Sequence, residues 1–196
     1  MAIEIRNAIE TDFAELVRIR LLASGGFDEA LYENLEKSVE EIIETELSDS
    51  ASTEHYKNYW VAMDDDEIVG GISAFPYDDE NLELDHPLLP KDRLVLEEPF
   101  ESIEAPGTYY IHAITVFPEF TRRGIGSMLL NLAREHAIAK GIKELSLYVF
   151  AENSGAISLY KKHGYEETGR SPINPHPKFI YSGDVLLMTC PAEHAS

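Results

Sequence analysis

Two glycines and two arginines occur together where a predicted strand gives way to a predicted helix. The stretch reads 121-TRRGIGS-127, with Arg122 and Arg123 followed by Gly124 and Gly126. The free backbone N–H groups at the start of a helix point outward and bind phosphate. Glycine lets a ligand approach the backbone closely, and arginine adds positive charge. The stretch predicts a phosphate-binding turn, although a plain strand-to-helix turn would also explain its glycines.

Two common nucleotide-binding loops do not fit this turn. The P-loop requires G-x-x-x-x-G-K-[ST], and no such run occurs in the chain. The dinucleotide fingerprint G-x-G-x-x-G requires a third glycine, which is missing after Gly126. If a phosphate binds at this turn, it belongs to another type of ligand.

A second motif follows one predicted strand later, in 152-ENSGAISLYKKHGYEETG-169. Its spaced positions are Asn153, Ala156, Leu159, Tyr160, Gly164 and Tyr165. Together with the turn, this segment resembles the GNAT superfamily of N-acetyltransferases. Members of that family join a pyrophosphate-binding turn, Q/R-x-x-G-x-G/A, to a later N-x-x-A-x-x-L-Y-x-x-x-G-F/Y segment. Thr121 departs from the usual Arg or Gln, so Arg122 would have to supply the long side chain over the pyrophosphate.

The resemblance implies a fold and a co-substrate. The implied fold is α+β (mixed α/β): a central, mostly antiparallel sheet of about seven strands, with strands 4 and 5 splayed and about four flanking helices. The implied co-substrate is acetyl-CoA, whose pantetheine arm occupies the gap between the splayed strands. The residues that the resemblance assigns to it are Ile114, Thr115, Val116, Thr121, Arg122, Arg123, Gly124, Ile125, Gly126, Ser127, Asn153, Ala156 and Tyr160.

The resemblance also implies how the thioester is activated. Family members polarise its carbonyl with a backbone N–H of the strand before the turn, here near residues 114–116. A tyrosine at the position of Tyr160 protonates the leaving thiolate. A phenol titrates near 10 and a thiol near 8.5, so this proton transfer is uphill by only about 2 kcal/mol. The alternative for Tyr160 is ordinary helix packing against Leu159 and Tyr165.

The sequence leaves the general base open. Some family members carry a glutamate early in this strand, but no carboxylate occurs between Gly107 and Phe117. His112 is the best candidate within the strand, because it shares a face with Tyr110 and histidine titrates near 6.5. Two alternatives remain: a packed histidine without a chemical role, or a carboxylate of the N-terminal half that acts through water.

Hydrophobic periodicity predicts the elements that position these residues. We expect strands at about 3–6, 60–63, 68–75, 109–117, 145–150, 165–170 and 185–190. We expect helices at about 12–22, 32–47, 126–140 and 154–163. Antiparallel hairpins followed by strand–helix–strand crossovers are typical of an α+β or mixed α/β fold. The acidic range 76–107 lacks periodicity, and the sequence allows a lid, a dimer contact or a decoration there.

Composition and charge limit the function classes. A chain of 196 residues fits a single domain, 1–196, with an insertion at about 76–107. The net charge is −20: residues 1–121 carry 7 basic and 29 acidic side chains, and residues 122–196 carry 9 and 7. Such a field repels nucleic acid and anionic lipid. The start lacks a signal-peptide pattern, no stretch suits a membrane span, and Cys190 is the only cysteine, so we expect a cytoplasmic protein.

In the GNAT family the acceptor meets the acetyl group between two loops, which correspond here to 23–32 and 171–183. Acids in or near the first loop could hold an ammonium group: Asp28, Glu29, Glu33 and Glu36. We therefore expect acetyl transfer to a primary amine of a small acceptor, with a cationic one favoured by charge, by direct attack in a ternary complex. A non-catalytic acyl-CoA sensor and an acidic scaffold are the alternatives. No metal is expected, and a homodimer is left open.

Overall fold

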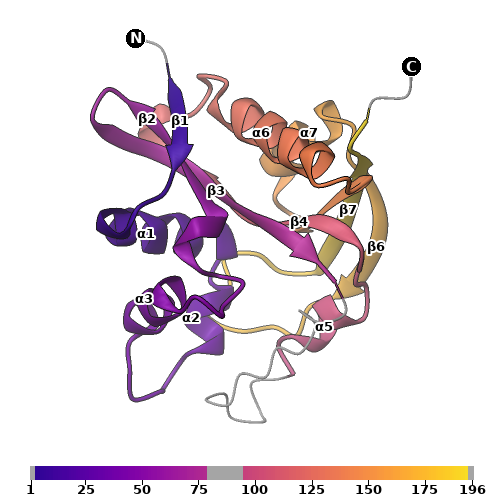
Figure 1. Cartoon of the computed structure of the whole chain (residues 1–196). Helices are drawn as coiled ribbons and strands as arrows, with labels where there is room; N and C mark the ends of the chain where they lie inside the picture. The colour runs from indigo at the N-terminus through magenta and orange to yellow at the C-terminus, as the bar shows by residue number, and fades with distance from the viewer. Residues whose placement is uncertain (1–2, 79–94, 194–196) are drawn as a thin grey trace.

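Seven strands form one mixed sheet in the computed structural model, which describes residues 3–78 and 95–193. The strands are β1 (Glu4–Asn7), β2 (Tyr59–Asp64), β3 (Glu67–Tyr77), β4 (Thr108–Val116), β5 (Glu144–Phe150), β6 (Glu166–Pro172) and β7 (Asp184–Pro191). Their order is β1-β2-β3-β4-β5-β7-β6, and only the central pair, β4 and β5, is parallel (Figure 1). The expected seven-stranded α+β fold is confirmed.

The central pair separates after a short parallel ladder. Pairing runs from Tyr109 opposite Leu145 to Ile111 opposite Leu147, while β4 continues to Val116 and β5 to Phe150. The remaining parts of the two strands diverge, which opens the middle of the sheet. The expected splay of strands 4 and 5 is confirmed.

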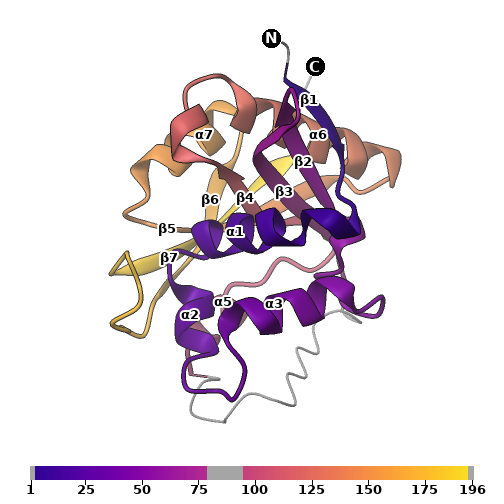
Figure 2. The same cartoon turned by 90° about the vertical axis from the view of Figure 1, so that its left-hand side faces the viewer.

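Helices cover both faces of the sheet. They are α1 (Phe13–Ser24), α2 (Phe27–Leu31), α3 (Val39–Ser48), α5 (Glu98–Glu101), α6 (Ile125–Ala139) and α7 (Ser154–Lys162), with 3-10 turns at Glu10–Asp12, Tyr56–Asn58 and Pro118–Phe120. Figures 1 and 2 show α1 to α3 on one face and α6 and α7 on the other. The described residues thus hold six α-helices rather than about four, because α2 and α5 are short additions. No helix in 3–78 or 95–193 has both the length and the apolar character needed to cross a bilayer.

Each layer has its own part of the core. Leu16 and Ile19 of α1 are fully buried against β2 and β3, and Leu129 of α6 is fully buried on the opposite face. A Cβ on Gly71 of β3 would lie 2.7 Å from Cδ1 of Ile19. This glycine therefore lets α1 pack directly on the strand next to β4.

The helix expected at 32–47 is wrong in its first turns. Asn34 has a φ of 63°, a left-handed conformation that a helix interior does not contain. Helix α3 starts later, at a capping box: the Ser38 hydroxyl accepts from Glu41 N at 3.2 Å, and Glu41 Oε2 accepts from Ser38 N at 2.8 Å. Leu35 extends the apolar pattern of the helix towards the N-terminus, which explains the early start that we expected. The capping box sets the first residue of α3 at Val39.

Of the acidic insertion, residues 76–78 and 95–107 lie within the described residues, and 79–94 lie outside them. The described part contains α5 between β3 and β4. The Phe100 ring packs edge-on against Phe27 of α2 at 4.9 Å and Tyr148 of β5 at 5.3 Å. The insertion thus reaches the open middle of the sheet.

Candidate active site

A cavity of about 960 Å³ lies where β4 and β5 diverge. Its lining comes from both halves of the chain: α1 to α3 and the loop after them, β4, β5, α5 and α7. Of the predicted site residues, it brings together His112, Ile114, Thr115, Val116, Thr121, Asn153, Ala156 and Tyr160. The other predicted residues, from Arg122 to Ser127, do not line this cavity, although Thr121 connects them to it.

The glycine turn supplies the start of α6. Gly124 has a φ of 81°, and a Cβ at this position would meet nothing within 4 Å. Helix α6 begins at Ile125, so the first N–H groups of the helix have no partner within it. The open space beside Gly124 and these free donors fit a pyrophosphate.

The remaining turn residues have other contacts. A Cβ on Gly126 would lie 3.0 Å from Cδ2 of Leu159, so this glycine allows α6 to pack on α7. The Ser127 hydroxyl lies 2.9 Å from Nε2 of His163. Arg123 pairs with Asp64 at 2.8 Å. Helix packing, a hydrogen bond and an ion pair thus also explain which residue types occur in this turn.

Tyr160 occupies the α7 side of the cavity and is almost fully buried. Its ring lies 5.9 Å from that of Tyr165, so the packing contact and the cavity position occur together. Burial, together with the neighbouring Tyr181, raises the pKa of the Tyr160 phenol well above 10. The phenol therefore holds its proton at neutral pH.

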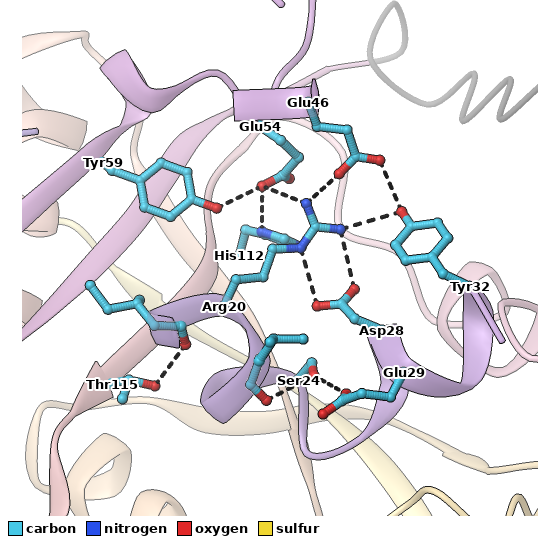
Figure 3. A network of polar contacts seen from close by, with 12 residues as sticks. Arg20, Ser24, Asp28, Glu29, Tyr32, Glu46, Glu54, Tyr59, His112 and Thr115 are labelled. Atoms are coloured by element: carbon cyan, nitrogen blue, oxygen red, sulfur yellow. Dashed lines mark hydrogen bonds and ion pairs between the residues drawn. The ribbon is translucent and has the colours of Figure 1, made fainter. Parts of the chain in front are cut away.

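His112 is the extra residue of a β-bulge in β4. Ser73 of β3 faces Ala113 and Ala74 faces Ile111, which leaves His112 without a partner across the ladder. Bulges redirect side chains and are frequent beside active sites. Here the His112 ring lines the cavity, and its Nδ1 lies 2.8 Å from Oε2 of Glu54 (Figure 3).

Glu54 comes from the loop before β2, and periodicity gave no signal for it. Burial by itself would raise the pKa of Glu54, but the charge and hydrogen bond of His112 outweigh it, with help from Arg20 and a hydrogen bond from Tyr59 at 3.1 Å. The pKa of Glu54 is lowered to about 2. The carboxylate therefore stays ionised and can balance a positive charge on His112.

Arg20 organises this side of the cavity. Its guanidinium is buried and donates two hydrogen bonds to Asp28, at 3.1 and 3.2 Å. It also donates to Glu46 and lies 3.9 Å from Glu54 (Figure 3). The sequence analysis did not predict this role. A charged residue on the apolar face of the first helix could have indicated that Arg20 is buried with partners. Three carboxylates around one arginine leave the network negatively charged.

The two loops expected at the acceptor site lie against each other. Ile180 N donates to Gly25 O at 3.0 Å, and a Cβ on Gly26 would lie only 2.0 Å from Lys178 O. The Phe27 and Phe179 rings stack at 6.0 Å. These contacts bring α2 and the β6–β7 loop together.

The expected acidic wall needs correction. Only Asp28 of its four members lines the cavity. Glu29 accepts from Ser24 at 3.4 Å, Glu33 lies 3.5 Å from His176, and Glu36 is exposed. Among the described residues, the carboxylates that do line it are Asp28, Glu46, Asp49, Glu54, Glu97, Glu101 and Glu104, and the only Lys or Arg is Arg20.

Metal chemistry has no candidate centre in the described ranges. Neither 3–78 nor 95–193 contains a group of three or more His, Cys, Asp or Glu side chains placed to hold an ion. Cys190 is buried in β7, as a small apolar residue would be.

A model of the acetyltransferase (GNAT) family matches residues 26–165, which include the bulge of β4, the glycine turn and all of α7. The chain belongs to this family. The GNAT fold also accounts for the splayed central strands: a crystal structure described as an acetyltransferase superimposes with a TM-score of 0.68 at 25% identity, over 97% of this chain and all of the other.

Curated relatives of this GNAT chain are N-acetyltransferases by name. An uncharacterized N-acetyltransferase of Methanocaldococcus jannaschii is 46% identical over 66 residues, which cover 34% of this chain and 29% of the relative. N-acetyltransferase family 8 member 3 of Rattus norvegicus is 27% identical over 154 residues, 79% of this chain and 56% of the relative. The aligned region thus spans about half of the rat relative and less than a third of the archaeal one.

Proposed function

We propose that this chain is an acetyl-CoA-dependent N-acetyltransferase that acetylates a primary amine of a small, cationic acceptor. The observation that carries the proposal is the placement of His112, paired with Glu54, and of Tyr160 in one cavity between the diverging strands. Direct transfer in a ternary complex fits this placement, since one cavity holds a proton acceptor and a proton donor together. The family and its N-acetyltransferase relatives support the reaction class.

Acetyl-CoA supplies the activated acetyl group. The residues of this chain that would hold it are the backbone of 114–116, the free N–H groups at the start of α6, and Asn153 and Ala156 at the start of α7. Arg122, which has a φ of 63° in the turn that leads to Gly124, would contribute positive charge. A backbone N–H of 114–116 would donate to the carbonyl oxygen of the acetyl group.

His112 takes the proton from the attacking amine in this proposal. Its Nδ1 contacts Glu54, so Nε2 is the nitrogen left to receive a proton. The ionised Glu54 stabilises the imidazolium that forms, and Arg20 and Tyr59 hold Glu54 in place. The sequence left a histidine base and a carboxylate of the N-terminal half as alternatives. In this proposal both take part, with His112 as the base and Glu54 as its partner.

Tyr160 holds the proton that the departing sulfur needs. Its raised pKa keeps the phenol protonated until negative charge develops on the sulfur. The side chain comes from α7, which also presents Asn153 and Ala156 to the same cavity. One helix thus supports both the co-substrate and the leaving group.

Charge supports a cationic acceptor. Within the part of the chain that the structure describes, seven carboxylates and one arginine line the cavity, together with aromatic rings that include Phe27, Phe100 and Tyr110. Acidic and aromatic side chains together bind ammonium groups by ion pairing and cation–π contact. An anionic acceptor would be repelled by the same lining.

The test is thiol release from acetyl-CoA by the purified protein with a panel of primary amines of different charge. Tyr160→Phe should lower kcat by about 100-fold or more, in the range for loss of a general acid. Tyr165→Phe is the matched control, because Tyr165 is also buried but does not line the cavity. Acetyl-CoA that raises the melting temperature without thiol release for any amine would overturn the proposal.

A further inference from the structure

Glu97 is a buried residue of the cavity wall whose carboxylate has no partner among residues 3–78 and 95–193. It is 6% exposed and lines the cavity from the residue before α5. No hydrogen bond or ion pair joins its carboxylate to another described residue. Burial and the neighbouring charge of Glu101 raise the pKa of Glu97 to about 7. A buried carboxylate without a partner is costly, so it points to a ligand that supplies the missing positive charge.

The segment that carries Glu97 is fixed to the rest of the molecule on several sides. Phe100 packs edge-on against Phe27 and Tyr148. Asn174 Nδ2 donates to Val95 O at 2.7 Å, and Ser102 Oγ donates to Ser171 Oγ at 3.0 Å. These contacts join α5 to α2, β5, β6 and the β6–β7 loop. Glu97 therefore belongs to a built wall of the cavity.

Other lining groups near this segment suit an ammonium ion. Glu101 and Glu104 follow Glu97 on the same segment, and both line the cavity. Tyr77 and Phe100 add aromatic rings to the lining. These groups are separate from the network of His112, Glu54 and Arg20, which comes from α1, from the loop before β2 and from β4.

We propose that Glu97, with Glu101 and Glu104, forms a subsite for a second ammonium group of the acceptor. The acceptor is then an aliphatic diamine or a longer polyamine. One amine lies at His112 and is acetylated, while the other remains protonated and pairs with Glu97. This inference rests on the proposed function and assigns residues 95–107 of the acidic insertion a role in substrate selection. A charge-assisted hydrogen bond at Glu97 would give a preference of about 10- to 100-fold for a diamine over a monoamine of equal length.

The experiment compares α,ω-diamines of increasing length with the monoamine and amino alcohol of the same length. The measured quantity is the ratio of kcat/KM for the diamine to kcat/KM for the monoamine. The wild-type ratio should be about 10 to 100 at the best length, and Glu97→Gln should bring it close to one. Glu98→Gln is the matched control, because Glu98 is exposed, lies next to Glu97 and does not line the cavity. This control should keep the wild-type ratio.

A calorimetric measurement of diamine binding to the protein with CoA gives a readout that does not depend on activity. Binding that weakens by about 10-fold or more in Glu97→Gln supports the subsite, even if no acetyl transfer is found and the proposed reaction fails. Transfer to diamines and monoamines with equal kcat/KM would overturn the subsite and leave the proposed reaction intact. Equal effects of Glu97→Gln and Glu98→Gln would also overturn it.

Discussion

At the scale of single residues, two glutamates of one cavity have pKa values that are shifted in opposite directions. His112, Arg20 and Tyr59 surround Glu54, and the pKa of Glu54 falls to about 2. Glu97 has no such partners, and burial raises its pKa to about 7. The difference follows from partners rather than from burial, because both carboxylates are removed from water. The carboxylate of Glu54, whose charge is balanced by its neighbours, suits a catalytic pair with His112. The carboxylate of Glu97, whose charge is not balanced by a described residue, suits a binding site for a cation.

The low pKa of Glu54 predicts a pH-dependent contribution to stability. Its pKa is about 2 in the folded state and near 4.5 in the unfolded chain, so its stabilising effect is complete above about pH 4.5. The effect is lost as the pH falls from 4.5 towards 2. Glu54→Gln should therefore lower the free energy of unfolding at pH 7 by up to about 3 kcal/mol and by much less at pH 3.

Urea unfolding of the wild type and Glu54→Gln at the two pH values measures this effect. The exposed Glu119→Gln provides a control, since its carboxylate lies on the surface. A loss of equal size at pH 7 and pH 3 would show that Glu54 acts through packing instead of charge.

At the scale of elements, the candidate acceptor region depends on a close contact between two connections. The turn from α1 to α2 places Gly25 and Gly26 against the β6–β7 loop, and both glycines have positive φ. The Ile180 N–H bonds to Gly25 O, and Lys178 O lies where a Cβ of Gly26 would be. Backbone atoms thus help to hold together two segments that are more than 150 residues apart.

Gly26→Ala and Gly183→Ala should differ strongly in stability. Both glycines have similar positive φ values, 92° and 87°, so either substitution should cost about 1–2 kcal/mol in backbone strain. Only the Gly26 Cβ meets an atom, Lys178 O at 2.0 Å, whereas the Gly183 Cβ meets nothing within 4 Å. Gly26→Ala should therefore cost a further 1–3 kcal/mol or so, from overpacking. Melting temperatures measure the difference, and equal losses would mean that the loops separate freely.

At the scale of the whole molecule, negative charge is concentrated where the acceptor is proposed to bind. The first 121 residues carry 29 acidic and 7 basic side chains, and they contain all seven carboxylates of the described cavity lining. The turn proposed to bind phosphate lies almost entirely in the nearly balanced C-terminal part. The molecule would therefore offer separate electrostatic environments to the proposed anionic co-substrate and the proposed cationic acceptor.

Salt should weaken the use of cationic acceptors according to their charge. Screening shortens the Debye length from about 10 Å at 0.1 M to about 3 Å at 1 M. We expect kcat/KM for a triamine to fall about tenfold or more over this range, and kcat/KM for a monoamine to fall less. Initial rates at saturating acetyl-CoA and increasing salt concentration give the slope of kcat/KM against salt for each acceptor. Identical slopes would show that the field of the acidic half does not act on the acceptor.

The sequence by itself determined the fold class, the family and most elements, because these depend on local periodicity and on two spaced motifs. It failed at Asn34, where a capping box and a left-handed residue decide the start of α3. It placed His112 on β4 but left its partner open. Glu54, Arg20 and Glu97 carry no periodic signal as a group, since they are distant in sequence and meet only in the cavity. Tertiary structure alone decided which carboxylates are compensated, because burial and the distance between charges exist only in the folded chain.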